Sequence, residues 1–298
     1  MEYRIERSLA GAVANNYGNS ITVSRRIPVS GGDINRAYAL ELSIDGSKLF
    51  MKVNRKENLG YFTAEAEGLA AIRSTGTVRT PAVIAIGTDG NDAFLLLEHI
   101  ESGRNSRASS AELGESLARM HMADTSSFVK NGLFGFTADN YIGAGEQINT
   151  PKQSWINFFI ECRLIPQFER ASKYFDRDER RNIDIFLSRI DRYLTEPEHP
   201  SLLHGDLWNG NYMIDSEGHP WLIDPAAYVG HAEADLAMTE LFGGFDRYFY
   251  DAYKDTAGID PGYRDRKDLY NLYHLLNHLN LFGGGYLYSV RSVLLRYI

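Results

Sequence analysis

Short apolar runs separated by polar turns dominate the first hundred residues of the chain and predict a sheet. The runs are rich in β-branched and aromatic residues, and turn-forming residues bound them at 30–33, 45–46 and 88–91. One helix is expected among them, over 61–73, because this stretch is rich in Ala and Glu. The expected strands cover 21–28, 37–44, 48–53, 82–87 and 93–99.

Helical periodicity replaces this pattern beyond residue 100. The polar stretch 101–110 is expected to be a linker, and Ser109 or Ser110 can cap the helix that follows. A strand-rich island around 202–224 interrupts further helices, which are expected over 183–194, 270–282 and 290–298. The pattern therefore predicts an α+β protein with a small β-rich lobe over 1–100 and a larger, mainly helical lobe over 101–298.

Charge and composition narrow the possible partners. The chain has 298 residues and a formal net charge of −8, which argues against nucleic acid as a main partner, because phosphate-backbone binding needs clustered Lys and Arg. Cys162 is the single cysteine, so neither an intrachain disulfide nor a cysteine-based zinc site is expected. No apolar run reaches the roughly 18 residues of a membrane span, and the N-terminal stretch has no secretory pattern. We therefore expect a cytoplasmic protein.

The residues most suited to chemistry lie in the strand-rich island. Asp206 lies in a polar loop, Asn211 follows five residues later, and Asp224 ends the next apolar run. Phosphoryl transfer from ATP needs one carboxylate that orients the attacking hydroxyl and accepts its proton. It also needs hard oxygen ligands for Mg²⁺, which an amide and a second carboxylate supply. We therefore expect Asp206 to be catalytic and Asn211 and Asp224 to bind the metal.

The spacing of these residues is typical of a kinase catalytic loop, in which H-x-D-x-x-x-x-N is followed by a metal-binding Asp. Gly205 stands where protein kinases carry Arg, a departure typical of kinases that act on small molecules. A turn-rich hairpin could use Asp and Asn for local hydrogen bonds instead. The ordered combination between two apolar strands favours the kinase interpretation and a bilobal protein-kinase-like fold.

Several segments outside the catalytic loop also follow a family pattern. Together with the loop, they cover nearly the whole chain, and their motifs are more specific than the general kinase set. The segments are 31–32, 50–54, 65–69, 204–211, 223–226, 230–238, 241–245 and 272–283. In these segments the chain resembles the fructosamine kinases, or ketosamine-3-kinases, which are relatives of the aminoglycoside and choline kinases.

The resemblance implies how ATP is bound. Lys52, at the end of an expected strand, is similar to the lysine that binds the α- and β-phosphates, and Glu65 stands where its carboxylate partner is expected. Glu67 is the alternative partner, but residues two apart on a helix face different ways, so only one of them can pair. Glu98 belongs to a stretch that resembles the hinge whose backbone reads the adenine edge.

Two further pairs of residues take supporting roles from the resemblance. Gly31 and Gly32 resemble the turn that covers the phosphates, where glycines let backbone N–H groups approach closely. A plain hairpin turn would have a similar sequence. Asp235 resembles the aspartate that ties down the catalytic loop from a helix N-terminus, and His204 is expected to support the same loop.

The sequence gives less information about the residues that contact the phosphate acceptor. Trp208 is expected to contact the sugar or amine of the acceptor, although packing beneath the loop is an alternative. His278 is expected to line the same pocket, with a hydrogen-bonded core position as the alternative. His274 and His278 are four residues apart, but no Glu follows His274 in an H-E-x-x-H arrangement, so a zinc site is not expected.

The resemblance implies an ATP- and Mg²⁺-dependent kinase for the 3-hydroxyl of ketosamines, which are sugar-modified amines. The acceptor could be a fructosamine or a ribulosamine, free or protein-bound, and the sequence leaves this choice and the oligomeric state open. An alternative is a kinase for another small alcohol such as an aminoglycoside, choline or a sugar. A second alternative is an inactive nucleotide-binding protein with a kinase-like fold, against which the intact set of Lys52, Asp206, Asn211 and Asp224 argues.

Overall fold

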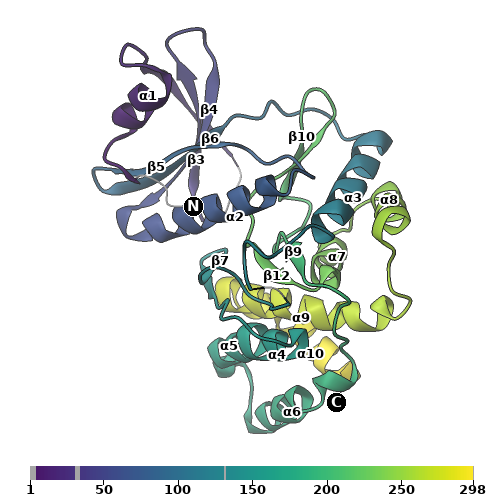
Figure 1. Ribbon diagram of the computed structural model, residues 1–298. Helices are drawn as coiled ribbons and strands as arrows, with labels where there is room; N and C mark the ends of the chain where they lie inside the picture. The colour runs from purple at the N-terminus through teal and green to yellow at the C-terminus, as the bar shows by residue number, and fades with distance from the viewer. Residues whose placement is uncertain (1–4, 31–33, 131, 298) are drawn as a thin grey trace.

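A six-stranded sheet forms the N-terminal part of the computed structural model, which describes residues 5–30, 34–130 and 132–297 (Figure 1). The strand order is β1-β5-β6-β4-β3-β2, and all neighbours are antiparallel except β1 and β5. The bounds are β1 Ile5–Glu6, β2 Val23–Val29, β3 Arg36–Leu42, β4 Lys48–Arg55, β5 Val83–Asp89 and β6 Asp92–Glu98.

Helices cover both faces of this sheet, which explains the continuous apolar runs of its central strands. Side chains alternate between the faces along a strand. Phe94 of β6 therefore packs in the cluster with α1 (Leu9–Tyr17), whereas its neighbour Leu95 packs in the cluster with α2 (Leu59–Ser74). Phe50 of β4 also packs against the α2 cluster, so Lys52, two residues further along β4, points toward the same helix.

The C-terminal part is mainly helical and surrounds α9, most of which is buried (Figure 1). Helix α3 packs along α8, and α7 and α10 pack against α9. The helices are α3 Arg107–His121, α4 Trp155–Phe159, α5 Ile165–Arg170, α6 Arg177–Leu187, α7 Ala232–Leu241, α8 Arg247–Ala257, α9 Tyr263–Phe282 and α10 Leu287–Tyr297, with a π-helical turn, η2 Ile160–Leu164, between α4 and α5.

Three short two-stranded sheets lie among these helices and position the polar loops. Strand β7 pairs with β8, β9 with β12, and β10 with β11, all antiparallel. Their bounds are β7 Asn140–Ile142, β8 Gly145–Gln147, β9 Ser201–Leu203, β10 Tyr212–Ile214, β11 Pro220–Leu222 and β12 Tyr228–Gly230.

The α+β prediction is confirmed, and five strands of the large sheet lie within a few residues of the expected ranges. Three helix starts differ clearly from expectation, and the largest difference is that α9 begins at Tyr263, seven residues before the expected range 270–282. Helix α3 begins at Arg107 because Ser106, rather than Ser109 or Ser110, is its N-cap and accepts a hydrogen bond from the Ser109 amide. Helix α6 begins at Arg177, before the apolar period that predicted it, because Asp176 forms a capping box there.

No helix in the described ranges combines the length and the apolarity that crossing a membrane requires. The division of the chain into lobes after residue 100 stays a prediction.

The capping box of α6 gives a test of the fold. Asp176 accepts a hydrogen bond from the Glu179 amide at 2.9 Å, and the Glu179 carboxylate accepts one from the Asp176 amide at 2.9 Å. Replacing a capping residue by Ala typically costs about 1 kcal/mol, so Asp176→Ala is expected to lower the free energy of unfolding by that amount in urea denaturation. Asp178→Ala, an exposed change in the same turn, is the control, and an equal loss in both variants would contradict the capping role.

Candidate active site

The two loops that carry the expected catalytic and metal-binding residues lie against each other. The first loop joins β9 to β10 and contains Asp206 and Asn211, and the second joins β11 to β12 and contains Asp224. Backbone hydrogen bonds connect them, from the Ala226 amide to the His204 carbonyl at 2.9 Å and from the Ile223 amide to the Asn211 carbonyl at 3.0 Å. The fold thus brings together residues that the chain separates by up to 18 positions.

Glycine is required where the loops approach each other most closely. Gly205 has a φ of +82°, and a Cβ built on it would lie 2.1 Å from the carbonyl oxygen of Ala226. Both the left-handed backbone and the collision exclude a larger residue. The Gly205 that replaces the Arg of protein kinases therefore also has a steric role in this chain.

Asp206 and Asn211 are joined by hydrogen bonds within the first loop. The Asn211 amide group donates to the Asp206 carbonyl at 2.7 Å and to the Asp206 carboxylate at 3.1 Å. The pKa of Asp206 is raised to about 7, mainly by burial and also by the charges of Asp224 and Asp235, against the opposing effect of the Asn211 hydrogen bond. A carboxyl group with a pKa near neutrality is suited to accept a proton from an attacking hydroxyl.

Lys52 connects the sheet to the second loop. Its ammonium lies 2.7 Å from a carboxylate oxygen of Glu65 on α2 and forms an ion pair with Asp224 as well. Burial alone would lower the pKa of Lys52, but the Asp224 and Glu65 carboxylates outweigh this effect and raise it, so the side chain is charged. Of the two candidate partners on α2, Glu65 is therefore the one in contact with Lys52.

Asp224 has an unusual backbone conformation. Its φ of +56° makes it the only non-glycine residue in the described ranges with a positive φ. Its side chain is 44% exposed, in contrast to that of Lys52, which is 8% exposed. A non-glycine residue in this region is strained and persists only where its surroundings hold it, as at many functional sites.

Asp235 anchors the catalytic loop from the N-terminal turn of α7. Its carboxylate accepts hydrogen bonds from the backbone amides of His204 at 2.7 Å and Gly205 at 2.9 Å, as the sequence predicted for a loop anchor. His121 of α3 lies 3.2 Å from the same carboxylate and 2.7 Å from the Tyr253 hydroxyl. Burial opposes ionisation of Asp235, but these hydrogen bonds and the nearby histidines lower its pKa, so it stays charged.

His204 supports the loop as a neutral side chain. Burial lowers its pKa, and its Nε2 donates to the Ile223 carbonyl at 2.8 Å. Its Nδ1 can then accept a hydrogen bond from the Asp206 amide at 3.3 Å. His204 therefore contacts both loops, beside the residue expected to be catalytic.

Two nucleotide-binding predictions remain, for the glycine turn and for Glu98. Gly31 and Gly32 lie outside the described residues. Glu98, at the end of β6, is half-buried, and its carboxylate accepts a hydrogen bond from the Ala82 amide at 3.0 Å. The Glu98 carboxylate is therefore engaged with the backbone just before β5, and a contact with adenine at this position stays a prediction.

Trp208 and His278 belong to one partly exposed aromatic cluster, which also contains Phe242, Phe282 and Tyr286. Trp208 is 39% exposed, so it is not buried beneath the loop. Its ring lies 6.4 Å from that of Phe242, which is 4.8 Å from the His278 ring. Phe282 and Tyr286 complete the cluster at 5.4 Å and 5.1 Å from His278. The catalytic loop and the end of α9 thus share an aromatic surface.

A metal ion at this site would depend on oxygen donors from both loops. Asn211 uses its amide NH₂ group on Asp206, and no described residue donates to its Oδ1. Within the described ranges no group of three or more His, Cys, Asp or Glu could hold a metal ion. Asn211 Oδ1 and the Asp224 carboxylate therefore fit Mg²⁺ that arrives with a nucleotide and takes its other ligands from phosphate oxygens and water.

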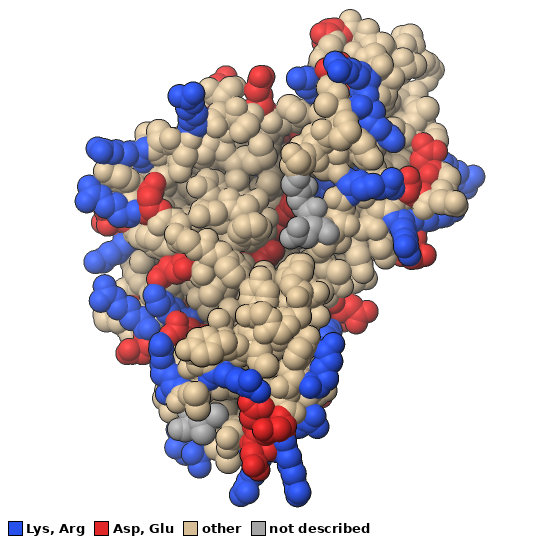
Figure 2. All heavy atoms as spheres, turned by 180° about the vertical axis from the view of Figure 1, so that it is seen from behind, with Lys and Arg blue, Asp and Glu red and all other residues tan. Residues whose placement is uncertain are grey.

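The charge in the cleft also favours a ligand that brings cations. Viewed from behind, Asp and Glu atoms are visible in the hollow at the centre of the molecule, beneath a surface that is otherwise mostly uncharged (Figure 2). In the candidate site, Glu65 and Asp224 contact the Lys52 ammonium, and Asp206 adds a further carboxylate near Asp224. A polyanionic nucleotide can bind beside these carboxylates only together with cations.

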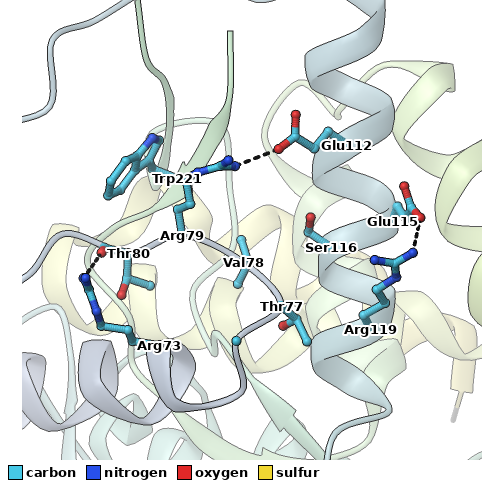
Figure 3. A pocket seen from close by; sticks show the side chains of 11 residues that line it. Arg73, Thr77, Val78, Arg79, Thr80, Glu112, Glu115, Ser116, Arg119 and Trp221 are labelled. Atoms are coloured by element: carbon cyan, nitrogen blue, oxygen red, sulfur yellow. Dashed lines mark hydrogen bonds and ion pairs between the residues drawn. The ribbon is translucent and has the colours of Figure 1, made fainter. Parts of the chain in front are cut away.

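A groove of about 580 Å³ lies elsewhere, between the end of α2, α3 and Trp221 (Figure 3). None of its lining residues is among the expected site residues. Arg79 pairs with Glu112, Arg119 pairs with Glu115, and Arg73 donates to the Thr80 carbonyl at 2.8 Å. Its arginines are thus already engaged, and the groove contributes no residue to the set expected from the sequence.

The comparisons with known proteins agree with this geometry. Residues 6–298 match the family model described as fructosamine kinase. The chain belongs to the fructosamine kinase family. A Synechocystis protein named "Probable ketoamine kinase" is 40% identical over 294 residues, which cover 97% of this chain and 95% of the relative. The chloroplastic protein-ribulosamine 3-kinase of Arabidopsis thaliana is 38% identical over 286 residues, covering 94% of this chain and 85% of that protein.

Solved structures agree with both the family and the fold. A crystal structure from Thermobifida fusca, provisionally described as a fructosamine-3-kinase, superposes with a TM-score of 0.82 at 31% identity and covers 96% of this chain and 97% of its own. A choline/ethanolamine kinase family protein from Mesorhizobium loti has a TM-score of 0.57 at 13% identity and covers 96% of this chain and 91% of its own. The chain is a phosphotransferase with a protein-kinase-like fold, which confirms two predictions from the sequence.

Sequence reasoning missed His121, whose ring joins the Asp235 anchor to Tyr253. The signal was present, because His121 lies four residues after Leu117, on the same face of the helix expected after the linker. A histidine there implies a buried polar partner. The partner itself could not be inferred, because Asp235 lies 114 residues further along the chain.

The contact at Gly205 gives a test of the loop geometry. Gly205→Ala adds both left-handed strain, about 1–3 kcal/mol, and the collision with Ala226, so it is expected to lower stability and the rate of phosphoryl transfer together. Gly218→Ala is the matched control, because Gly218 also has a positive φ, of +94°, but a Cβ there would meet only Ser109 Oγ at 3.7 Å. Gly205→Ala should unfold at a lower temperature and turn over more slowly than Gly218→Ala. Equal unfolding temperatures and equal turnover in the two variants would refute the steric role of Gly205.

Proposed function

We propose that the protein transfers the γ-phosphate of ATP to the 3-hydroxyl of a ketosamine carried by an amine or a protein lysine. The observation that supports this proposal best is the convergence of Asp206, Asn211 and the Lys52–Asp224 ion pair in one cleft. The relatives named as a ketoamine kinase and a protein-ribulosamine 3-kinase support the class of acceptor. A cytoplasmic location is part of the proposal, since ATP is the phosphate donor.

The proposed mechanism assigns one task to each polar residue. Asp206 accepts the proton of the acceptor hydroxyl while its oxygen attacks the γ-phosphorus and the bond to ADP breaks. Lys52, held by Glu65, binds the α- and β-phosphate oxygens. Asn211 and Asp224 would hold Mg²⁺, which would neutralise the phosphate charge. The Lys52–Asp224 ion pair must then exchange partners, because both side chains are needed by the metal nucleotide.

Aromatic side chains are proposed to form the acceptor side of the cleft. Trp208 lies two residues from Asp206 and is exposed, so a sugar or a cationic amine can lie against its ring. His278 donates its Nδ1 hydrogen to the His274 carbonyl at 2.8 Å, which leaves Nε2 able to accept a hydrogen bond from an acceptor hydroxyl. Phosphorylation of the 3-hydroxyl is expected to destabilise the sugar adduct and release the amine, which would be a repair function.

The acceptor is tested by ADP release with Mg-ATP and a panel of ribuloselysine, fructoselysine, choline, an aminoglycoside and no acceptor. Selective turnover with one or both ketosamines is the expected outcome, because these match the family. Turnover with choline or the aminoglycoside alone would retain the kinase mechanism and reject the acceptor. Nucleotide binding without turnover on any acceptor would instead indicate an inactive kinase-like scaffold.

The catalytic assignment is tested by Asp206→Asn. Loss of a general base typically lowers the rate about 10²- to 10⁴-fold, so kcat should fall in that range while the affinity for Mg-ATP measured by calorimetry is retained. Asp224→Asn is expected to behave differently and to lose the Mg²⁺ dependence of nucleotide binding.

An exposed aspartate provides the matched control for both changes. Asp255→Asn, on the surface of α8, should leave kcat and nucleotide binding unchanged. Near-normal turnover in Asp206→Asn would show that another group accepts the proton.

A further inference from the structure

The hairpin β7–β8 lies behind the loop that carries Asp224 and contacts it through buried amide side chains. Gln147, at the end of β8, is 1% exposed. Its Nε2 donates to the Ala226 carbonyl at 2.9 Å. Ala226 is two residues beyond Asp224, so a side chain from a distant part of the chain holds the backbone next to the expected metal ligand.

Asn140, at the start of β7, makes the equivalent contact one residue further along. Its Nδ2 donates to the Ala227 carbonyl at 2.7 Å, and its Oδ1 accepts a hydrogen bond from Gln147 Nε2 at 2.8 Å. Ala226 and Ala227 are both buried, so their carbonyls would lack water if these two amides were removed. Two adjacent carbonyls of the second loop are therefore satisfied by two side chains of one hairpin.

The orientation of both amides is fixed by further buried partners. The Tyr273 hydroxyl donates to Gln147 Oε1 at 2.7 Å, and Asn149 Nδ2 donates to Asn140 Oδ1 at 2.9 Å. These bonds leave Gln147 Nε2 and Asn140 Nδ2 as the groups that face the loop. Neither amide can rotate by 180° without losing a hydrogen bond on each side.

A buried arginine completes the support. Arg163 is fully buried within the π-helical turn and donates to Asn149 Oδ1 at 2.8 Å. Its guanidinium lies 4.0 Å from the centre of the Tyr228 ring and 4.6 Å from that of Phe158. A π-helical turn is uncommon and often marks a functional region. The chain thus places a buried cation and a π-helical turn next to the amides that support the Asp224 loop.

The position of Ala226 determines the relation between the two loops of the active site. Its amide donates to the His204 carbonyl, and its carbonyl lies where a Cβ of residue 205 would be. The positive φ of Asp224, just before it, is a conformation that needs external support. Gln147 provides that support through the same Ala226 carbonyl that lies against Gly205, and Asn140 provides it through the next carbonyl, that of Ala227.

We propose that Gln147 and Asn140 are positioning residues for phosphoryl transfer, which set the place of the Asp224 carboxylate relative to Asp206 by holding the carbonyls of Ala226 and Ala227. The inference rests on the proposed function, since it takes Asp224 as the metal ligand. Residues that orient a metal ligand from behind typically contribute about 10- to 100-fold to metal affinity or activity. Neither residue contacts the nucleotide or the acceptor in this proposal.

Gln147→Leu is the principal variant, because Leu fills much of the same volume but cannot donate a hydrogen bond. Nucleotide affinity is measured by calorimetry with and without Mg²⁺, alongside kcat and the thermal unfolding midpoint. Mg²⁺ is expected to increase nucleotide affinity about 10- to 100-fold less in this variant than in the wild type, and kcat is expected to fall by a similar factor. Nucleotide binding without the metal should be unchanged. Asn140→Ala should show the same pattern.

Ser110→Ala is the control for a purely structural loss. Ser110 is buried and bonds Asp246 and Asn105 where α3 meets α8, away from both loops. Ser110→Ala should lower the thermal unfolding midpoint without changing the Mg²⁺ dependence of nucleotide binding. An unchanged Mg²⁺ dependence in Gln147→Leu, or an equal change in Ser110→Ala, would overturn the proposal.

Two further outcomes are separated by the same measurements. If the wild type binds nucleotide in a Mg²⁺-dependent way but phosphorylates no ketosamine, the proposed function fails, and the binding data still decide the role of Gln147. If Gln147→Leu does not fold, Tyr273→Phe removes only the hydroxyl that orients Gln147. A smaller loss of the Mg²⁺-dependent gain in that variant would support the proposal, and no loss would overturn it.

Discussion

The contact between the Ala226 carbonyl and Gly205 is the constraint on which the active site depends. Asp206 follows Gly205 directly, and Asp224 precedes Ala226 by two residues, so this contact fixes the relation of the two carboxylates. The approach is possible because residue 205 has no side chain and adopts a positive φ. Asp235 holds one loop through the amides of His204 and Gly205, and the β7–β8 hairpin holds the other through its carbonyls.

An ion pair connects the active-site loops to the N-terminal sheet. Lys52 and Glu65 come from β4 and α2, which the apolar core on one face of the sheet holds together, and Lys52 reaches across to Asp224. Its ammonium partly offsets carboxylates that would otherwise repel one another in a region of low dielectric. In the proposed mechanism this ion pair occupies Asp224 until a metal nucleotide supplies another cation.

Much of the fold was predictable, because strands and amphipathic helices leave periodic signals. The central strands were found from continuous apolar runs, and the structure explains these runs by helices on both faces of the sheet. The segment that contains Asn140, Gln147 and Arg163 was not assigned any role from the sequence. Its elements are short, and buried amides have no periodicity. Their partners are backbone carbonyls about 80 residues away, which no local pattern encodes.

The sequence by itself determined the class of chemistry, because the types and order of Asp206, Asn211 and Asp224 are set by what a metal nucleotide and a hydroxyl require. The family resemblance added that Lys52 would have a carboxylate partner on the following helix, with Glu65 expected and Glu67 as the alternative. Only the tertiary structure decided between these two, paired Lys52 with Asp224 as well, and determined which side chains hold the two loops. The physical reason is that ligand chemistry restricts residue types, whereas distances between loops depend on packing across the whole chain.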